Sequence, residues 1–126
     1  MERRVAHVGQ VCVCFALRTT GTSPGYEFLE QLNAEEPRQY RKLLGLFLWL
    51  GDHGWINNRE RFKPIENTEF FEFKNGQVRM PCYRVGNSFI ITHGFIKKKN
   101  KIDSQEIDRA RLIKKEDDAR VKARNR

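Results

Sequence analysis

Residues 70–80 read Phe-Phe-Glu-Phe-Lys-Asn-Gly-Gln-Val-Arg-Met and carry the strongest local fold signal in the chain. Asn75-Gly76 between two stretches of alternating polarity is typical of a β-hairpin, because a type I′ turn needs positive φ at both central residues. A two-residue turn here places Glu72 opposite Arg79, which predicts a cross-strand ion pair. The expected apolar face carries Phe71, Phe73, Val78 and Met80, and the expected polar face carries Glu72, Lys74, Gln77 and Arg79.

A strand and two helices are expected before the hairpin. Residues 11–17 are short, apolar and rich in β-branched side chains, which indicates a strand. Ser23 offers an N-cap oxygen with Pro24 at the first helical position. A second helix follows residue 37, with its apolar stripe at Tyr40, Leu43, Leu44, Phe47 and Leu48. Trp49 is out of phase with this stripe, so it either packs in the core, which we expect, or contacts a partner.

A third strand and a last helix are expected after the hairpin. Pro81 predicts an edge position or a bulge, because proline donates no ladder hydrogen bond. Residues 88–96 form an apolar strand that runs into Lys97-Lys98-Lys99-Asn100-Lys101. Asp103 or Ser104 caps a helix whose apolar stripe is Ile107, Ala110 and Ile113. We therefore expect one α+β domain over residues 1–113 and a charged tail over 114–126 that is frayed or disordered.

The charge of the chain is concentrated in one segment. The 126 residues suit a single domain with its own core, and a hydrophobic fraction of 39% with nine Phe excludes a disordered chain. Residues 1–69 carry nine basic and nine acidic side chains, residues 70–102 seven and one, and residues 103–126 eight and six. Most of the net charge of +8 therefore lies in residues 70–102, which favours an anionic partner there, with nucleic acid the leading candidate.

Several classes of protein are disfavoured by the sequence. No stretch is long and apolar enough for a membrane span, and the first residues lack a secretory signal, so we expect a cytoplasmic protein without membrane contact. Cys12, Cys14 and Cys82 are odd in number and contain no Cys-x-x-Cys pair, so we expect structural cysteines. We expect no metal and no other cofactor.

A longer pattern spans the hairpin and the strand after it. Residues 70–74 are followed by Arg79 and then by His93-Gly94-Phe95-Ile96-Lys97-Lys98. This pattern resembles the RelE/ParE superfamily of toxins from toxin–antitoxin pairs, and within it the phage-derived, HigB-like branch. The resemblance covers roughly residues 11–113. It implies a RelE-like fold: an N-terminal strand, a helical hairpin, an antiparallel sheet of about four strands and a C-terminal helix.

The resemblance also implies a reaction. Relatives with ribonuclease activity cut messenger RNA, often on the ribosome, by attack of a 2′-hydroxyl on the adjacent phosphate. This step needs a proton acceptor, a proton donor and positive charge on the phosphorane, and lysine among other cations can supply a base because like charges favour its neutral form. The catalytic candidates are Arg79, His93, Lys97, Lys98 and Lys101. The RNA-binding candidates are Lys74, Lys99, Tyr83 and Arg84.

Three of these candidates have a competing interpretation. His93 alternates with apolar residues along its strand, so a core histidine is as consistent with the pattern as a catalytic one. Tyr83 either stacks on a base or packs as an ordinary half-buried strand residue, which we favour. Arg84 lies five residues after Arg79 and therefore on the opposite face, unless a bulge at Pro81 intervenes.

The resemblance leads to one favoured function and two alternatives. The favoured function is the toxin of a type II toxin–antitoxin system, acting as a metal-independent endoribonuclease on RNA, free or on the ribosome, and held by a helix-turn-helix antitoxin. A ParE-like toxin that poisons gyrase shares the fold without the chemistry. The third reading is a non-catalytic module that binds RNA or an acidic protein through the same basic patch.

Overall fold

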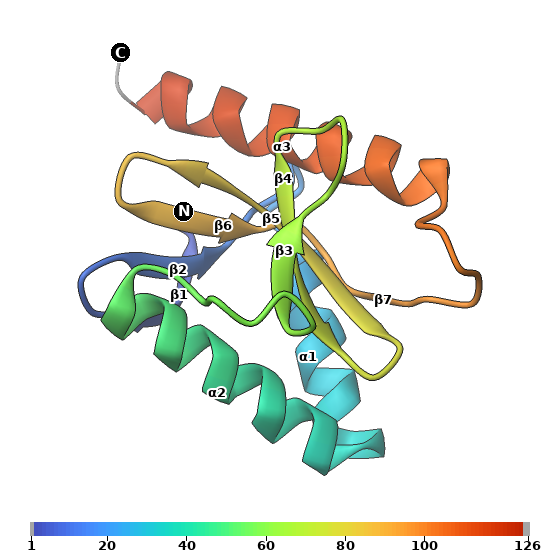
Figure 1. Cartoon of the computed structure of the whole chain (residues 1–126). Helices are drawn as coiled ribbons and strands as arrows, with labels where there is room; N and C mark the ends of the chain where they lie inside the picture. Colours follow the sequence, from blue (N-terminus) through green and yellow to red (C-terminus); the bar gives the residue numbers. More distant parts are fainter. Residues whose placement is uncertain (1, 125–126) are drawn as a thin grey trace.

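The computed structural model describes residues 2–124 and has an α+β fold in three layers (Figure 1). A mixed sheet lies between α1 and α2 on one face and α3 on the other (Figure 1). The strands are β1 (Arg4–Val8), β2 (Cys12–Phe15), β3 (Phe62–Pro64), β4 (Phe70–Asn75), β5 (Val78–Val85), β6 (Ser88–Ile91) and β7 (Phe95–Ile96). The helices are α1 (Pro24–Glu35), α2 (Pro37–His53) and α3 (Ser104–Arg124).

The sheet is larger than the expected four antiparallel strands. Its order is β1-β2-β6-β5-β4-β3, and β7 pairs with the hairpin end of β5. The pairing of β2 with β6 is parallel, so the sheet is mixed rather than antiparallel throughout. Neither edge strand was predicted: β1 is largely exposed, and β3 is only three residues long within the polar stretch 57–67.

The hairpin of β4 and β5 forms as predicted, but its register is shifted by two residues. The turn consists of Gly76 and Gln77, so Lys74 pairs with Arg79 and Glu72 with Pro81. Gly76 has a φ of 56°, a conformation that glycine adopts without steric cost. A shift of two residues leaves every side chain on its predicted face, because the side-chain period of a strand is two.

Pro81 lies inside the sheet without a bulge, contrary to prediction. It is paired with Glu72 on one side. On its other side β7 pairs with residues 78–79 and β6 with residues 82–85, so the missing N–H of Pro81 faces the gap between these two strands. Pro81 therefore costs the sheet no hydrogen bond between strands, so it need not lie on an edge strand or at a bulge.

The predicted strand over residues 88–96 is divided into β6 and β7 by the segment 92–94. Gly94 packs against the ring of Phe28 in α1, and a Cβ at this position would overlap that ring. The break carries the chain across to the hairpin end of β5, where the Lys97 N–H donates to the carbonyl of Gln77 at 2.7 Å. The first lysine of the basic run is thereby fixed beside the hairpin.

The first two helices begin where predicted, with differences in detail. Pro24 opens α1, but the buried Ser23 hydroxyl makes no capping hydrogen bond. The buried face of α2 runs through Leu43, Phe47 and Leu50. Trp49, expected in the core, is 55% exposed, because it points away from this face and stacks on His53.

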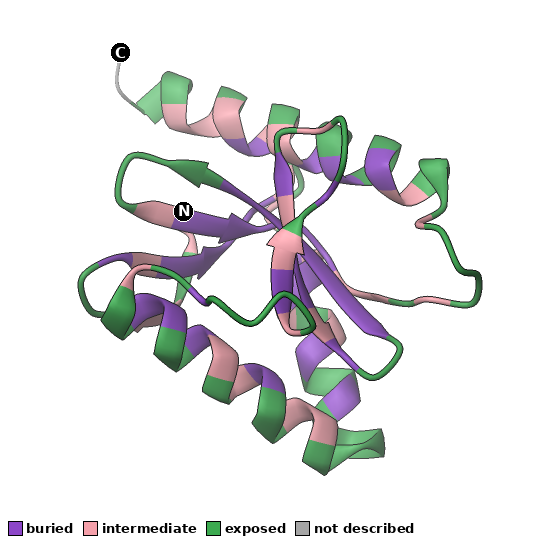
Figure 2. Ribbon diagram, viewed as in Figure 1, coloured by how far each residue is buried: buried purple, intermediate pink, exposed green. Residues whose placement is uncertain are grey.

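The two faces of the sheet bury separate clusters, seen as the purple interior of Figure 2. The larger cluster lies under α1 and α2 and includes Phe47, Phe73 and Phe89. The smaller cluster lies under α3, where Ile107, Ala110 and Ile113 are buried as predicted. The free cysteines Cys14 and Cys82 belong to these cores, in agreement with a structural role.

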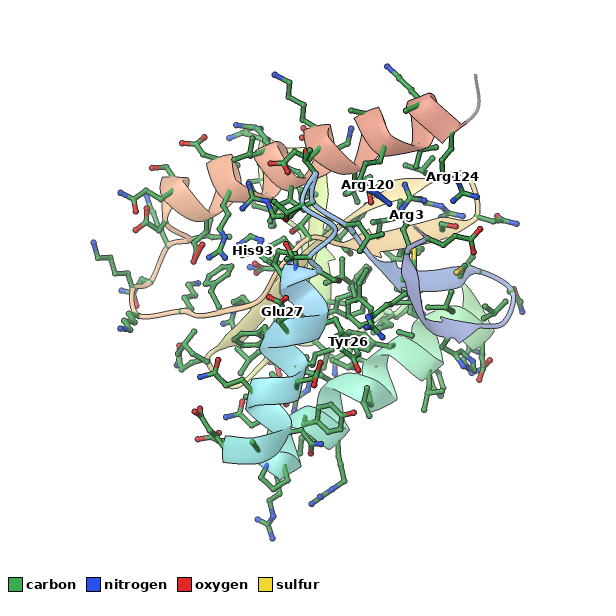
Figure 3. All side chains as sticks on the ribbon, turned by 180° about the vertical axis from the view of Figure 1, so that it is seen from behind. Arg3, Tyr26, Glu27, His93, Arg120 and Arg124 are labelled. Carbon is green, nitrogen blue, oxygen red and sulfur yellow. The ribbon has the colours of Figure 1, made fainter. Side chains whose placement is uncertain are left out.

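The charged C-terminal stretch is ordered helix rather than a frayed end over residues 114–124. Asp117 is 1% exposed and accepts hydrogen bonds from Arg3, from the Leu17 N–H at 2.9 Å and from the Tyr83 hydroxyl at 3.1 Å. Figure 3 shows Arg3 beneath the end of α3, near Arg120 and Arg124. Residues 125–126 of the predicted tail lie outside the described residues. No helix within residues 2–124 combines the length and apolar character needed to cross a bilayer.

Candidate functional site

Four basic side chains gather at the hairpin end of the sheet. We call Lys63, Lys74, Arg79 and Lys97 the sheet cluster. Lys74 pairs with Arg79, and Lys63 pairs with Glu72, the residue two before Lys74. Arg79 also pairs with Phe95, two residues before Lys97. Because residues opposite each other, or two apart on one strand, share a face, Lys63, Lys74 and Arg79 project on the same side. Lys97 follows β7 directly, and its charge acts on Lys74.

Lys74 is at the electrostatic centre of the sheet cluster. Partial burial and the positive charges of Lys63, Arg79 and Lys97 lower the pKa of Lys74 from its ordinary value of 10.5, against the opposing effect of Glu72. Both causes disfavour the charged ammonium, one by removing water and the others by repulsion. The neutral amine of Lys74 is therefore more accessible than that of an isolated surface lysine.

Arg79 is buried and held by the hairpin turn. Its Nη1 donates to the carbonyls of Gly76 at 2.6 Å and Val78 at 2.9 Å. Its Nε lies 3.9 Å from a carboxylate oxygen of Glu72 and makes no hydrogen bond. The predicted ion pair is thus present, although the register shift makes it diagonal rather than directly across. With the residue 7% exposed, Arg79 acts as a fixed positive charge behind the surface.

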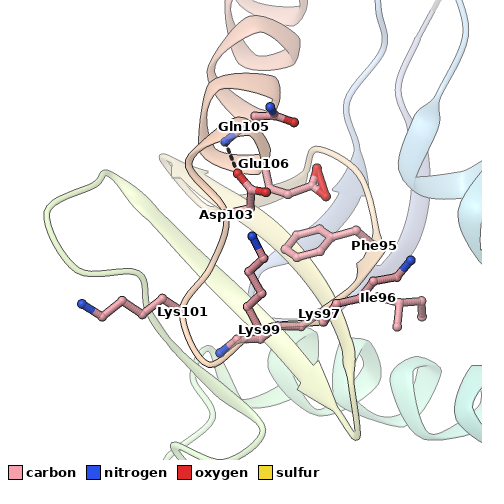
Figure 4. A pocket seen from close by; sticks show the side chains of 9 residues that line it. Phe95, Ile96, Lys97, Lys99, Lys101, Asp103, Gln105 and Glu106 are labelled. Atoms are coloured by element: carbon pink, nitrogen blue, oxygen red, sulfur yellow. Dashed lines mark hydrogen bonds between the residues drawn. The ribbon is translucent and has the colours of Figure 1, made fainter.

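The lysine run after β7 forms one wall of an open pocket of about 510 Å³ (Figure 4). We call it the loop pocket; it is lined by Phe95, Ile96, Lys97, Lys98, Lys99, Lys101, Asp103, Gln105 and Glu106. Asp103 caps α3, as predicted, by accepting a hydrogen bond from the Gln105 N–H at 2.9 Å. Lys97 belongs to both groups and joins the sheet cluster to the loop pocket. Lys98, Lys99 and Lys101 are exposed, and Lys101 points away from the pocket in Figure 4.

His93 lies in the interior beside the loop pocket. It is 1% exposed; its Nδ1 is 3.0 Å from the Thr92 hydroxyl, and its Nε2 is 3.3 Å from a carboxylate oxygen of Glu106. Burial and the charge of Arg109 lower the pKa of His93 to about 4, so its ring is neutral at pH 7. These surroundings are those of a core histidine with hydrogen-bond partners, which was the competing interpretation of His93.

Tyr83 and Arg84 are not brought together with the sheet cluster. Tyr83 is 1% exposed, packs edge-on against Phe70 and bonds to Asp117 in α3, so neither ring face is open to a base. Arg84 is exposed on the opposite face, where its guanidinium lies over the ring of Phe89. Since β5 has no bulge at Pro81, the alternation that separates Arg84 from Arg79 holds.

Lys63 is the member of the sheet cluster that the sequence did not indicate. It stands in a polar stretch with Pro64, which reads as a connecting loop. The alternation of Phe62, Lys63 and Pro64 is too short to distinguish a strand from a loop. The register with β4 is what places Lys63 beside Lys74, and no local signal carries that information.

The donor groups of the site are mainly ammonium and guanidinium. Within residues 2–124, no group of three His, Cys, Asp or Glu side chains is placed to hold a metal ion. Lysine and arginine provide positive charge for a phosphate directly, and a lysine with a lowered pKa also provides a base. The arrangement can therefore bind a phosphodiester and accept a proton from a neighbouring hydroxyl.

Comparison with known proteins identifies the family of the chain. The family model described as phage derived protein Gp49-like (DUF891) matches residues 27–115, which contain most of α1, all of α2, the sheet cluster and the loop pocket. No curated protein matches the chain. The family match covers more than half of the sequence, and the chain therefore belongs to the phage-derived Gp49-like family, a family in the RelE/HigB-like toxin group.

Proposed function

We propose that this chain is the toxin of a type II toxin–antitoxin pair and that it cleaves RNA through the sheet cluster. The observation that carries the proposal is the convergence of Lys63, Arg79 and Lys97 on Lys74, with the resulting decrease in the pKa of Lys74. Membership of a family in the RelE/HigB-like toxin group supports the same reading, as does an element order compatible with a RelE-like fold of the HigB-like branch.

The proposed reaction is attack of a ribose 2′-oxygen on the adjacent phosphate. Neutral Lys74 takes the 2′-hydroxyl proton, the new bond from the 2′-oxygen to phosphorus forms, and the bond to the 5′-oxygen breaks. Lys97 donates a proton to the leaving 5′-oxygen, which leaves a 2′,3′-cyclic phosphate. Lys63 and the fixed charge of Arg79 stabilise the negative charge that develops on the phosphorane.

The proposal uses the candidates unequally. Because Arg79 is buried, it acts through the effect of its positive charge on Lys74 and makes little direct contact with the RNA. Contact with the phosphate is therefore assigned to the lysines. Lys98, Lys99 and Lys101 extend the basic surface along the RNA strand, where each phosphate contact adds salt-dependent affinity. His93 and Tyr83 are left out of the reacting groups because they are buried. The proposed setting is the cytoplasm, with a helix-turn-helix protein as antitoxin and no metal requirement.

An RNA cleavage assay with EDTA present, with and without translating ribosomes, tests the proposal. The wild-type chain should leave 2′,3′-cyclic phosphate ends, and Lys74→Ala should reduce the cleavage rate by about a hundredfold, within the usual contribution of a general base. Arg84→Ala is the matched control, since it removes an exposed cation from the opposite face of the same strand. Intact RNA under both conditions would overturn the proposal, and loss of gyrase supercoiling in a parallel assay would identify a gyrase poison instead.

A further inference from the structure

The loop pocket contains groups that phosphate binding does not require. One wall carries lysines, whereas the other carries the ring of Phe95 and the carboxylate of Glu106, which lie next to each other in Figure 4. In the described part of the chain, Glu106 forms no ion pair with a lysine of this pocket; its side-chain partner is His93, whose ring is neutral at pH 7. Because no lysine of the pocket pairs with it, the carboxylate of Glu106 can still accept hydrogen bonds from a ligand in this basic pocket.

Phe95 lines the loop pocket and has one ring face covered by His93. The ring of His93 stacks on it with centroids 5.5 Å apart and an angle of 24° between the planes. Phe95 itself is only half-buried and lines the loop pocket. A flat aromatic ligand can stack on the remaining face, and an unpaired nucleobase is the flat group that an RNA strand brings.

Glu106 is held at the edge of this stacking position by the buried histidine. Nε2 of the neutral His93 ring lies 3.3 Å from Glu106 Oε1, and a proton on this nitrogen donates to the carboxylate. The Nδ1 of the ring lies 3.0 Å from the Thr92 hydroxyl, which also reaches the Pro81 carbonyl at 3.3 Å. The remaining charged groups that act on this pair are Arg109 and Asp103 in and before α3. His93 therefore positions both components, since its face supports Phe95 and its N–H orients Glu106.

We infer that the loop pocket is a base-binding subsite for guanine, with the base stacked on Phe95 and its Watson–Crick edge donating to the carboxylate of Glu106. Guanine presents two adjacent donors on this edge, N1–H and the N2 amino group, and a carboxylate accepts both. Adenine, cytosine and uracil each place an acceptor beside their donor, which a carboxylate oxygen repels. The lysines on the opposite wall bind the phosphate of the same nucleotide.

This inference rests on the proposed function and adds the identity of the nucleotide next to the cleaved bond. It can be wrong while the proposed nuclease activity holds. The first test measures binding of the 3′-monophosphates of guanosine, adenosine, cytidine and uridine to the full chain by isothermal titration calorimetry. Guanosine 3′-monophosphate should bind about tenfold more tightly than the other three, in line with one bidentate base contact. Equal affinities, or no measurable binding of any of the four, would overturn the subsite.

Two variants separate the roles of the carboxylate and the ring. Glu106→Gln should bring the four affinities within about twofold of each other, because an amide offers one acceptor and one donor. Phe95→Leu should weaken all four nucleotides about tenfold and keep the guanine preference, since stacking is insensitive to base identity. Asp108→Asn, an exposed neighbour on α3, is the control and should bind as wild type does. A guanine preference that persists in Glu106→Gln would overturn the assignment.

Mapping of cleavage sites on a random RNA pool distinguishes this inference from the proposed function. If wild type cleaves next to guanine and Glu106→Gln cleaves without base preference, the result supports both the subsite and the nuclease. Cleavage without base preference overturns the subsite and leaves the nuclease. Preferential binding of guanosine 3′-monophosphate by a chain that cleaves no RNA supports the subsite and overturns the nuclease.

Discussion

The hydroxyl of Tyr83 in β5 donates a hydrogen bond to the carboxylate of Asp117 in α3, at 3.1 Å within the core. The same carboxylate accepts from Arg3 and from the Leu17 N–H, so one buried acid joins the N-terminal strand, the sheet and the last helix. This network attaches a helix whose buried apolar residues are Ile107, Ala110 and Ile113.

Replacement of Asp117 by alanine should lower the free energy of unfolding by about 3–5 kcal/mol, because the partners of a buried charge are left without compensation. The matched control is Asp118→Ala, which removes a partly exposed pair with Lys114 one turn earlier and should cost about 0.3–0.5 kcal/mol. Urea unfolding followed by circular dichroism measures both. Equal losses in the two variants would contradict the role given to Asp117.

The buried His93 should make the protein less stable in mild acid. Its pKa is about 4 in the folded chain against 6.5 when exposed, so the unfolded state binds more protons between these values. The stabilising contribution is complete above pH 6.5 and is lost as the pH falls toward 4, by about 3 kcal/mol in total.

His93→Gln isolates this contribution from that of the carboxylates. The variant should be less stable at pH 7 and should lose less stability than wild type between pH 6.5 and pH 4. Urea unfolding at a series of pH values provides the comparison. Parallel pH profiles in the two proteins would show that His93 does not resist protonation.

Gly94 should not tolerate alanine, because a Cβ at this position overlaps the ring of Phe28. Overpacking of this kind typically costs about 1–3 kcal/mol, and Phe28→Leu in the same chain should recover part of the loss. Gly45→Ala is the counterpart: it lies inside α2, its Cβ meets nothing, and it should stabilise by about 0.5–1 kcal/mol. Thermal unfolding of the variants would detect the opposite signs, and a stabilising Gly94→Ala would disprove the contact.

The sequence predicted most of the local structure and one face of the site. The hairpin at 70–80, the start of α1 and the stripe of α3 follow from turn residues, Pro24 and apolar spacing, which are local signals. The polar face with Lys74 and Arg79 survived a register error because the error was two residues. The family resemblance rests on residues of the same segment, namely 70–74, Arg79 and 93–98.

The remaining features depend on tertiary pairing. Trp49 is exposed because the sheet packs against α2 along Leu43, Phe47 and Leu50. The apolar pattern of α2 alone does not determine which of its faces is buried. Lys63 joins the site only through the pairing of β3 with β4. The helix over 114–124 is held by Asp117, whose partners lie 34 to 114 residues away in the sequence, where no local pattern indicates them.

The salt dependence of RNA binding tests the central claim most directly. A 2′-O-methyl RNA cannot be cleaved and still presents its phosphates, so its affinity can be measured from low to moderate salt for wild type, for Lys63→Ala/Lys74→Ala/Lys97→Ala and for Arg84→Ala. Removal of three phosphate contacts should reduce the slope of log K against log salt by about 2, at about 0.7 for each contact to a single strand, while Arg84→Ala keeps the wild-type slope. An unchanged slope in the triple variant, or an equal decrease in Arg84→Ala, would contradict the account.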